Sequence, residues 1–252
     1  MKRVSWKPVM IAAALVWPSF QASAGWMDKV GDLLGGADSS TSPATSQTAV
    51  AALSHSDMIA GLKDALRVGS ENVVGQLGKS DGFNADPKIH IPLPENLQTV
   101  KSALGAVGMA SMMDDLELKL NRAAETATPK AKRIFGDAIR AMTFDDAKNI
   151  LNGPKDAATQ YFKGKMSVPL SDEMRPVVTK ALSQAGAVQA YDAAMGEYAS
   201  LPFVPDVKAN LTQHVLDLGM SGIFLYMAEE EAAIRTNPVK RTTEILQKVF
   251  SR

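Results

Sequence analysis

The sequence predicts an all-α protein: a compact multi-helix bundle with one short, extended, Pro-rich segment, preceded by a signal peptide and a flexible linker. Three observations lead to this fold class. Apolar residues recur at helical spacing through most of residues 56–252. One strand-like piece is present, and prolines interrupt it. The 252-residue chain has no cysteine, so in an oxidising compartment a hydrophobic core must stabilise it without disulfides.

The N-terminus has the three parts of a cleavable signal peptide over residues 1–24. The basic region contains Lys2, Arg3 and Lys7. A short apolar run follows at residues 9–17, and Ala22-Ser23-Ala24 forms an A-x-A cleavage site. The apolar run is shorter than the roughly 20 residues that span a bilayer. We therefore expect cleavage after Ala24, export to the periplasm and no transmembrane span in the mature chain. An uncleaved anchor is the alternative.

The charge balance argues against a nucleic-acid partner. The whole chain has 27 Lys and Arg against 27 Asp and Glu. Cleavage removes three basic residues and no acidic one, so the mature chain has a net charge of −3. Binding nucleic acid requires a basic patch that displaces counterions from the phosphates, which a slightly acidic chain does not suggest.

Residues 25–55 predict a short amphipathic segment followed by a flexible linker. Trp26, Val30, Leu33 and Leu34 share one side of the first part, and Gly, Ser, Thr and Ala dominate the second. Association of residues 26–34 with a membrane surface is a weak option, because this segment is short and carries little positive charge. A single helical domain is expected over residues 56–252.

Periodicity and capping signals divide this domain into helices. We expect them at residues 57–77, 95–127 with a possible break at Gly105 and Gly108, 130–142, about 144–152, 154–164, 172–184, 187–199, 206–235 and 238–250. Residues 82–98 hold the extended piece, in which Ile89 and Ile91 alternate with His90 between prolines.

Several helix ends have specific signals. Thr128-Pro129 predicts a cap followed by proline at the first helical position, and Asn152-Gly153 predicts a left-handed C-cap. Thr143 and Asp146 resemble a capping box. Asp145 and Asp146 lie at the N-terminus of that helix, where the helix dipole stabilises carboxylates. This position explains the two acidic residues better than metal binding does.

A second polar stripe runs along the helix that contains residues 112–128. Asp114, Leu118, Asn121 and Glu125 share a second face, separate from the main apolar stripe, and Arg122 flanks it. A leucine within a polar stripe suggests that this face is covered as well. The alternative is a solvated face with one exposed leucine, which is common.

One carboxylate of the helix at 206–235 is predicted to point inward. Glu230 falls within the apolar arc beside Ile223 and Ile234, whereas Glu231 and Arg235 project to the opposite side. A buried carboxylate must be paired, bound to metal or protonated. Partners of suitable chemistry are Arg122, Arg133 and Arg241, and a structural ion pair is preferred to a ligand site. Glu230 would instead be solvated if the helix ended earlier.

Templates for known catalytic and cofactor sites do not match. The three histidines, His55, His90 and His214, are scattered, and no pair has metal-ligand spacing. No phosphate-binding glycine loop is present. Residues 219–222 lie in a helix, so they are not a nucleophile elbow, and their small side chains are expected to let another helix approach. We assign no catalytic residue, cofactor or metal.

Eight short segments together resemble an uncharacterised family of exported bacterial proteins, the domain of unknown function 4197 (DUF4197). They are GLKDAL (61–66), IHIPLP (89–94), NRAAE (121–125), IFGDAIRAMT (134–143), ILNG (150–153), AATQYF (157–162), EEEAAIR (229–235) and RTTEILQKVF (241–250). Departures are modest, such as Leu120 where methionine is common. The resemblance implies a helical periplasmic domain and carries over no catalytic or binding residues.

The segments that carry the resemblance include 121–125 and 229–235, where the helical projection also found unusual polar residues. We therefore expect a polar cluster inside the bundle, made of Asn121, Arg122, Glu125, Glu230, Arg235 and Arg241.

Two functions follow as hypotheses. The first is a binding or structural module without catalysis, whose partner is a protein or a small or lipidic ligand. The second is an enzyme of unfamiliar type, a hydrolase or a divalent-metal-dependent enzyme. It would use Glu125 and Glu230 as acid and base or as cation ligands, with Asn121 and Arg122 positioning the substrate. An enzyme requires the polar cluster to open onto a cleft, whereas a structural cluster can be sealed.

Overall fold

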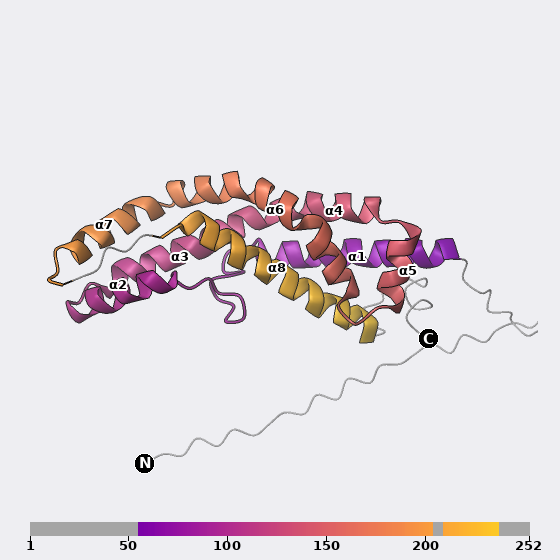
Figure 1. Cartoon of the computed structure of the whole chain (residues 1–252), viewed down its shortest axis with the longest axis horizontal. Helices are drawn as coiled ribbons and strands as arrows, with labels where there is room; N and C mark the ends of the chain where they lie inside the picture. The colour runs from indigo at the N-terminus through magenta and orange to yellow at the C-terminus, as the bar shows by residue number, and fades with distance from the viewer. Residues whose placement is uncertain (1–54, 204–208, 237–252) are drawn as a thin grey trace, which may run out of the picture. The chain divides into compact units, whose positions relative to one another are not determined.

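Helices account for most of residues 55–203 and 209–236, the parts of the chain that the computed structural model describes. They are α1 (His55–Leu77), α2 (Glu95–Ala106), α3 (Ala110–Ala127), α4 (Ala131–Ala141), α5 (Phe144–Asn152), α6 (Ala157–Gln184), α7 (Ala187–Ala199) and α8 (Leu211–Thr236) (Figure 1). The predicted signal peptide, amphipathic segment, linker and last helix lie outside the described residues, and so does Arg241.

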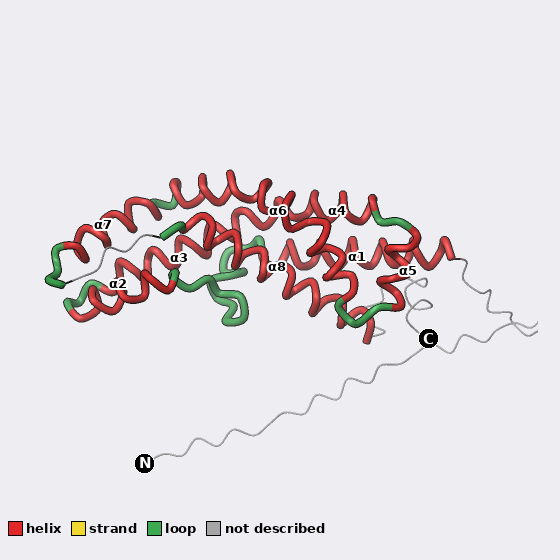
Figure 2. Tube along the Cα trace, in the orientation of Figure 1, coloured by secondary structure: helices red, strands yellow, loops and turns green. Residues whose placement is uncertain are grey.

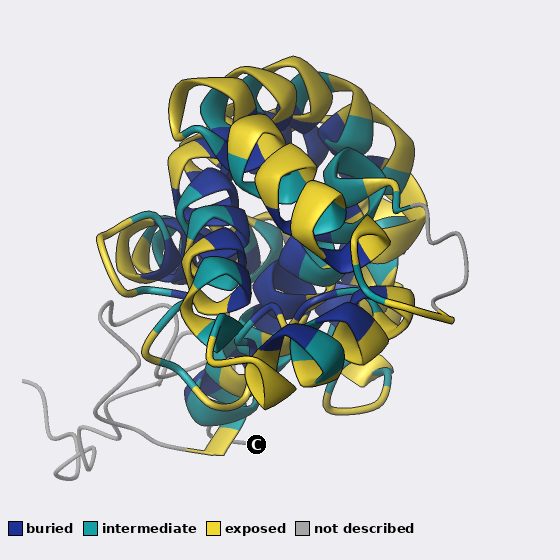
Figure 3. Cartoon of the chain, turned by 90° about the vertical axis from the view of Figure 1, so that its left-hand side faces the viewer, coloured by how far each residue is buried: buried dark blue, intermediate teal, exposed yellow. Residues whose placement is uncertain are grey.

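The helices pack as an all-α bundle. The long α6 lies against α8, α3 and α4, while α1 lies against α8 and α4, and α2 and α7 cover one end of α3. Buried residues lie on the faces where the helices meet, and exposed residues lie on the outside (Figure 3). Phe135 of α4 and Phe162 of α6 meet edge to face in this core, with ring centroids 5.0 Å apart.

The connection between α1 and α2 is the main irregular element that is buried in part. We call residues 78–94 the 78–94 loop; it consists of turns and extended backbone, and the described residues contain no strand (Figure 2). Phe83, Ile89, Ile91 and Leu93 insert into the core, each at most 6% exposed. The predicted Pro-rich piece is therefore irregular, as expected, but turns continue as far as Ile89 and α2 begins at Glu95, so residues 90–94 are its only continuous stretch free of turn and helix. Its apolar side chains anchor it.

Several predicted helix ends are confirmed. The predicted break after Gly105 separates α2 from α3, and Gly108 adopts a φ of +81°, which favours glycine. At the start of α5, the Thr143 hydroxyl accepts from the Asp146 amide while the Asp146 carboxylate accepts from the Thr143 amide, which is a capping box.

Two predicted ends were wrong. Thr128 is helical, is buried and donates its hydroxyl to the carbonyl of Ala124, because a 3-10 turn at Thr128–Lys130 joins α3 to α4 without a cap. Gly153 is extended, with φ −83° and ψ −178°, so α5 does not end in a left-handed cap.

The predicted division of residues 154–184 into two helices was also wrong. Helix α6 continues through Pro169 and Pro176, both of which are exposed. Its buried side chains recur every fourth residue, at Ala158, Phe162, Met166, Leu170, Met174, Val178 and Leu182. Core packing along this stripe outweighs the cost of the two prolines, and the helix changes direction along its length (Figure 1).

Candidate functional site

Glu125 of α3 holds the start of the 78–94 loop. Its side chain lies inside the bundle, and the residue is 3% exposed. One carboxylate oxygen accepts the backbone N–H groups of Phe83 and Asn84, both at 3.1 Å. The other accepts from the Arg122 guanidinium at 2.7 Å. We call this group the Glu125 clamp; it satisfies one buried and one partly buried amide of a segment that is neither helix nor strand.

Arg122 extends the Glu125 clamp to the surface. Its second terminal nitrogen donates to Asp81 at 2.8 Å, and the Asn84 side chain donates to the same Asp81 oxygen at 2.9 Å. The bond to Glu125, supported by Asp81, raises the pKa of Arg122. Hydrogen bonds from Asn84 and Arg122 hold the pKa of Asp81 below its usual value.

Asn121 holds the other end of the same loop. It is buried, accepts from the Ile91 amide and donates to the Ile91 carbonyl, each at 2.9 Å, as a neighbouring strand would. It also donates to the carbonyl of Glu117 at 2.9 Å. The amide group is therefore well supplied with partners.

Other side chains fasten the loop from outside. Tyr226 of α8 donates to Asp86, and this bond, followed by burial, raises the pKa of Tyr226 to about 12. Lys88 pairs with Glu229 at 2.8 Å. His90 has both ring nitrogens close to oxygens, the Asn84 carbonyl at 2.9 Å and the Glu117 carboxylate at 2.7 Å.

A second buried carboxylate belongs to Glu231 of α8, which is 5% exposed. It accepts the backbone N–H groups of Ala158 and Thr159 and the Thr159 hydroxyl, all at 2.9 Å. Arg235 donates to it at 2.8 Å and to the Ile150 carbonyl at the end of α5. We call this group the Glu231 clamp; it places a carboxylate at the N-terminus of α6, where the helix dipole favours one.

The helical projection therefore chose the wrong glutamate of α8. Glu231 is the buried one, whereas Glu230 is half-buried and accepts from the Asn72 side chain at 3.3 Å. Glu230 lies against Gly69 of α1, where an added Cβ would be 3.2 Å from its Cγ. The two glutamates are adjacent, so the prediction was wrong by one residue in the rotation of α8. Glu231 is the buried one because it accepts from the amides at the N-terminus of α6.

The structure does not bring the described members of the predicted polar cluster together as one group, and Arg241 lies outside the described residues. Asn121, Arg122 and Glu125 hold the 78–94 loop, Arg235 belongs to the Glu231 clamp, and Glu230 contacts α1. Gly219 of α8 lies beside Ala124, and Glu230 lies eleven residues further along the helix, about 16 Å away. Glu125 and Glu230 are thus not placed as a catalytic pair. Leu118 is 38% exposed, so its side of α3 is covered only near Asn121 and Glu125.

Gly219 and Gly222 allow α3 and the 78–94 loop to pack close to α8, and the approach of a helix was predicted from the small size of these residues. A Cβ at Gly219 would lie 3.7 Å from that of Ala124, in ordinary contact with α3. A Cβ at Gly222 would lie 2.9 Å from the Phe83 ring and 3.2 Å from Ile89, so a larger residue there would displace the loop.

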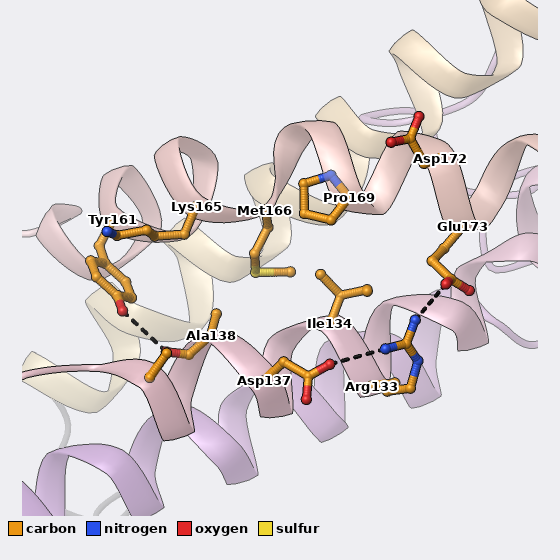
Figure 4. Close-up of a pocket in the computed structure, with 11 residues that line it drawn as sticks. Arg133, Ile134, Asp137, Ala138, Tyr161, Lys165, Met166, Pro169, Asp172 and Glu173 are labelled. Atoms are coloured by element: carbon orange, nitrogen blue, oxygen red, sulfur yellow. Dashed lines mark hydrogen bonds and ion pairs between the residues drawn. The ribbon is translucent and has the colours of Figure 1, made fainter.

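A groove of about 540 Å³ lies between α4 and α6. Its floor is apolar, formed by Ile134, Ala138, Met166 and Pro169 (Figure 4). Arg133 crosses one end and pairs with Asp137 at 3.1 Å and Glu173 at 2.5 Å. Tyr161 and Lys165 lie at the other end, where the Tyr161 hydroxyl donates to the Ala138 carbonyl. We call this feature the α4–α6 groove.

Within the described residues, no group of three or more His, Asp or Glu side chains is placed to hold a metal ion. None of the helices described is long and apolar enough to cross a membrane.

A family model described as "Protein of unknown function (DUF4197)" matches residues 52–251. The chain belongs to the DUF4197 family. All eight segments that carry the resemblance lie inside this match. Neither a curated protein nor a solved structure shows significant similarity to this DUF4197 chain.

The family segments fall on the clamps of this DUF4197 protein. NRAAE contains Asn121, Arg122 and Glu125, and IHIPLP contains the Ile91 that Asn121 binds. EEEAAIR contains Glu231 and Arg235, and AATQYF contains the amides that Glu231 binds. Sequence reasoning did not find the α4–α6 groove, although Pro169, next to the buried i+4 stripe of α6, was a signal for an irregular turn there.

Proposed function

We propose that this protein acts in the bacterial periplasm as a binding module without catalysis, and that the α4–α6 groove is its binding surface. The periplasmic location rests on the signal peptide expected at residues 1–24. The observation that supports the binding role most is the groove itself, because its volume falls within the 300–1,000 Å³ typical of ligand sites. An apolar floor with a few charged groups at its ends is the usual composition of such sites.

The two clamps support the same proposal by their chemistry. Their buried oxygens are occupied by backbone amides and arginines of the same chain. Groups used in this way fix the loop and the α6 N-terminus. The α4–α6 groove, by contrast, has an apolar floor open to a ligand.

Native mass spectrometry of protein purified from its own periplasm tests the proposal. We expect a retained small-molecule adduct on the wild type. Ala141→Trp, which adds an indole at an exposed position lining the groove, should remove that adduct without unfolding the protein. Ala193→Trp on the exposed side of α7 is the matched control and should keep it. An adduct that survives Ala141→Trp, or a wild type that carries none, would contradict the proposal.

A further inference from the structure

We propose that the ligand of the α4–α6 groove is a free amphipathic carboxylate with a single alkyl chain, whose head group pairs with Lys165. This inference rests on the proposed function, because it names the ligand of the same groove. It is argued from the charges at the two ends of the groove and from the apolar floor between them.

The acidic groups of the groove are neutralised or turned away. Asp137 accepts from both Arg133 and Arg140, and Glu173 pairs with Arg133. Asp172 directs its carboxylate away from α4 (Figure 4). A cationic ligand would therefore find Asp137 and Glu173 already paired with arginine, and the Asp172 carboxylate directed away from α4.

Lys165 is the cation that remains for a ligand. It is exposed, its ammonium lies 5.9 Å from the centre of the Tyr161 ring, and no ion pair of Lys165 is found among the described residues. The nearby carboxylate of Asp146, at the start of α5, already accepts from the Thr143 amide and hydroxyl; these bonds, followed by the charge of Lys165, lower the pKa of Asp146. An aromatic face holds an ammonium in place weakly and leaves its hydrogen-bond donors accessible. A carboxylate is the natural complement of this end of the groove.

The floor next to Lys165 suits an alkyl chain. From Lys165 to Glu173 the groove follows α6 for eight residues, or about 12 Å. Ile134, Ala138 and Met166 line this stretch with side chains of 9% exposure or less. Pro169 has no N–H, so the Lys165 carbonyl lacks the hydrogen bond that it would accept from residue 169 in a regular helix. This turn of α6 is therefore held less tightly. The Arg133–Glu173 pair closes the far end, so the tail has a defined limit.

Calorimetric titration with sodium dodecanoate below its micelle concentration tests the assignment. We expect dodecanoate to bind, and Lys165→Gln to weaken binding about fivefold, as the loss of one partly exposed ion pair implies. Lys163→Gln is the matched control: Lys163 lies two residues away on the α6–α8 side, near Phe224, and should leave binding unchanged. Ala141→Trp should abolish binding.

Dodecyltrimethylammonium, which has the same tail and a cationic head, separates this inference from the proposed function. If it binds as tightly as dodecanoate and Ala141→Trp blocks both, the groove is a binding site but the anionic ligand class is wrong. Dodecanoate binding that survives Ala141→Trp, or that is absent in the wild type, also overturns the assignment. The adduct experiment on periplasmic protein then still decides the broader proposal independently.

Discussion

The clamps and the α4–α6 groove use charged residues in opposite ways. In the Glu125 and Glu231 clamps, each carboxylate is buried and its oxygens are occupied by two backbone amides and an arginine. In the groove, charged side chains border a floor that is apolar and mostly buried, and Lys165 is exposed. The conspicuous polar residues of these clamps therefore indicate where the fold is held, and the proposed binding surface lies elsewhere.

The largest expected effect comes from removing the Glu125 clamp. Glu125→Ala leaves the Phe83 and Asn84 amides without their acceptor and removes the partly buried ion pair with Arg122, which keeps only Asp81, so we expect a loss of about 3 kcal/mol in the free energy of unfolding. Chemical denaturation measures it, and Leu118→Ala on the exposed side of the same helix should change stability little. A small loss for Glu125→Ala would show that the 78–94 loop does not depend on this carboxylate.

Glu231→Gln tests the second clamp more gently, because the amide keeps the shape and loses the charge. We expect a loss of about 2 kcal/mol, since a charge-assisted pair with Arg235 and a favourable helix-dipole contact are removed. Glu230→Gln, at the neighbouring half-buried position, should cost less. Equal losses would mean that burial does not distinguish these two residues.

Tyr226→Phe should lower stability by about 1 kcal/mol at neutral pH, because the hydrogen bond to Asp86 is lost. The folded pKa of about 12 lies above the usual value of 10, so this contribution is complete below pH 10 and disappears as the pH rises towards 12. Denaturation of both proteins at several alkaline pH values should show the two stabilities converging in that window. A constant difference through pH 12 would argue against the Asp86 contact.

The smallest effect is expected at Tyr198 of α7. Its hydroxyl is buried and has no hydrogen-bond partner among the described residues, although the residue is only 2% exposed. Removing the oxygen removes an uncompensated desolvation cost, so Tyr198→Phe should keep thermal stability unchanged or raise it by about 1 kcal/mol. A clear loss in a thermal melt would reveal a partner for this hydroxyl.

The fold was predictable because its helices follow local rules. Periodicity located α1 to α5, α7 and α8, and Thr143 with Asp146 marked the start of α5. It failed at α6, where two helices were predicted at 154–164 and 172–184 but a continuous buried stripe decided the outcome. The partners of buried polar groups could not be predicted, because they are backbone amides distant in sequence, such as Phe83 for Glu125 and Ala158 for Glu231.

The same lack of information about partners distant in sequence explains why the candidate site was predicted only in part. Asn121, Arg122 and Glu125 were recognised as an unusual group on α3, yet their role became clear only when the 78–94 loop was seen to lie on them. Glu230 was chosen over Glu231 because a broad apolar arc leaves the rotation of α8 uncertain by one residue. The α4–α6 groove depends on how two helices diverge, which no single-helix projection contains.

The most direct test compares a clamp variant and a groove variant in one experiment. Glu125→Gln and Ala141→Trp would be purified from the periplasm in parallel with the wild type, and each preparation would be measured for melting temperature and for the adduct in native mass spectrometry. We predict that Glu125→Gln melts at a lower temperature but keeps the adduct, whereas Ala141→Trp melts normally and loses it. A Glu125→Gln protein that melts like the wild type and loses its adduct would contradict this division.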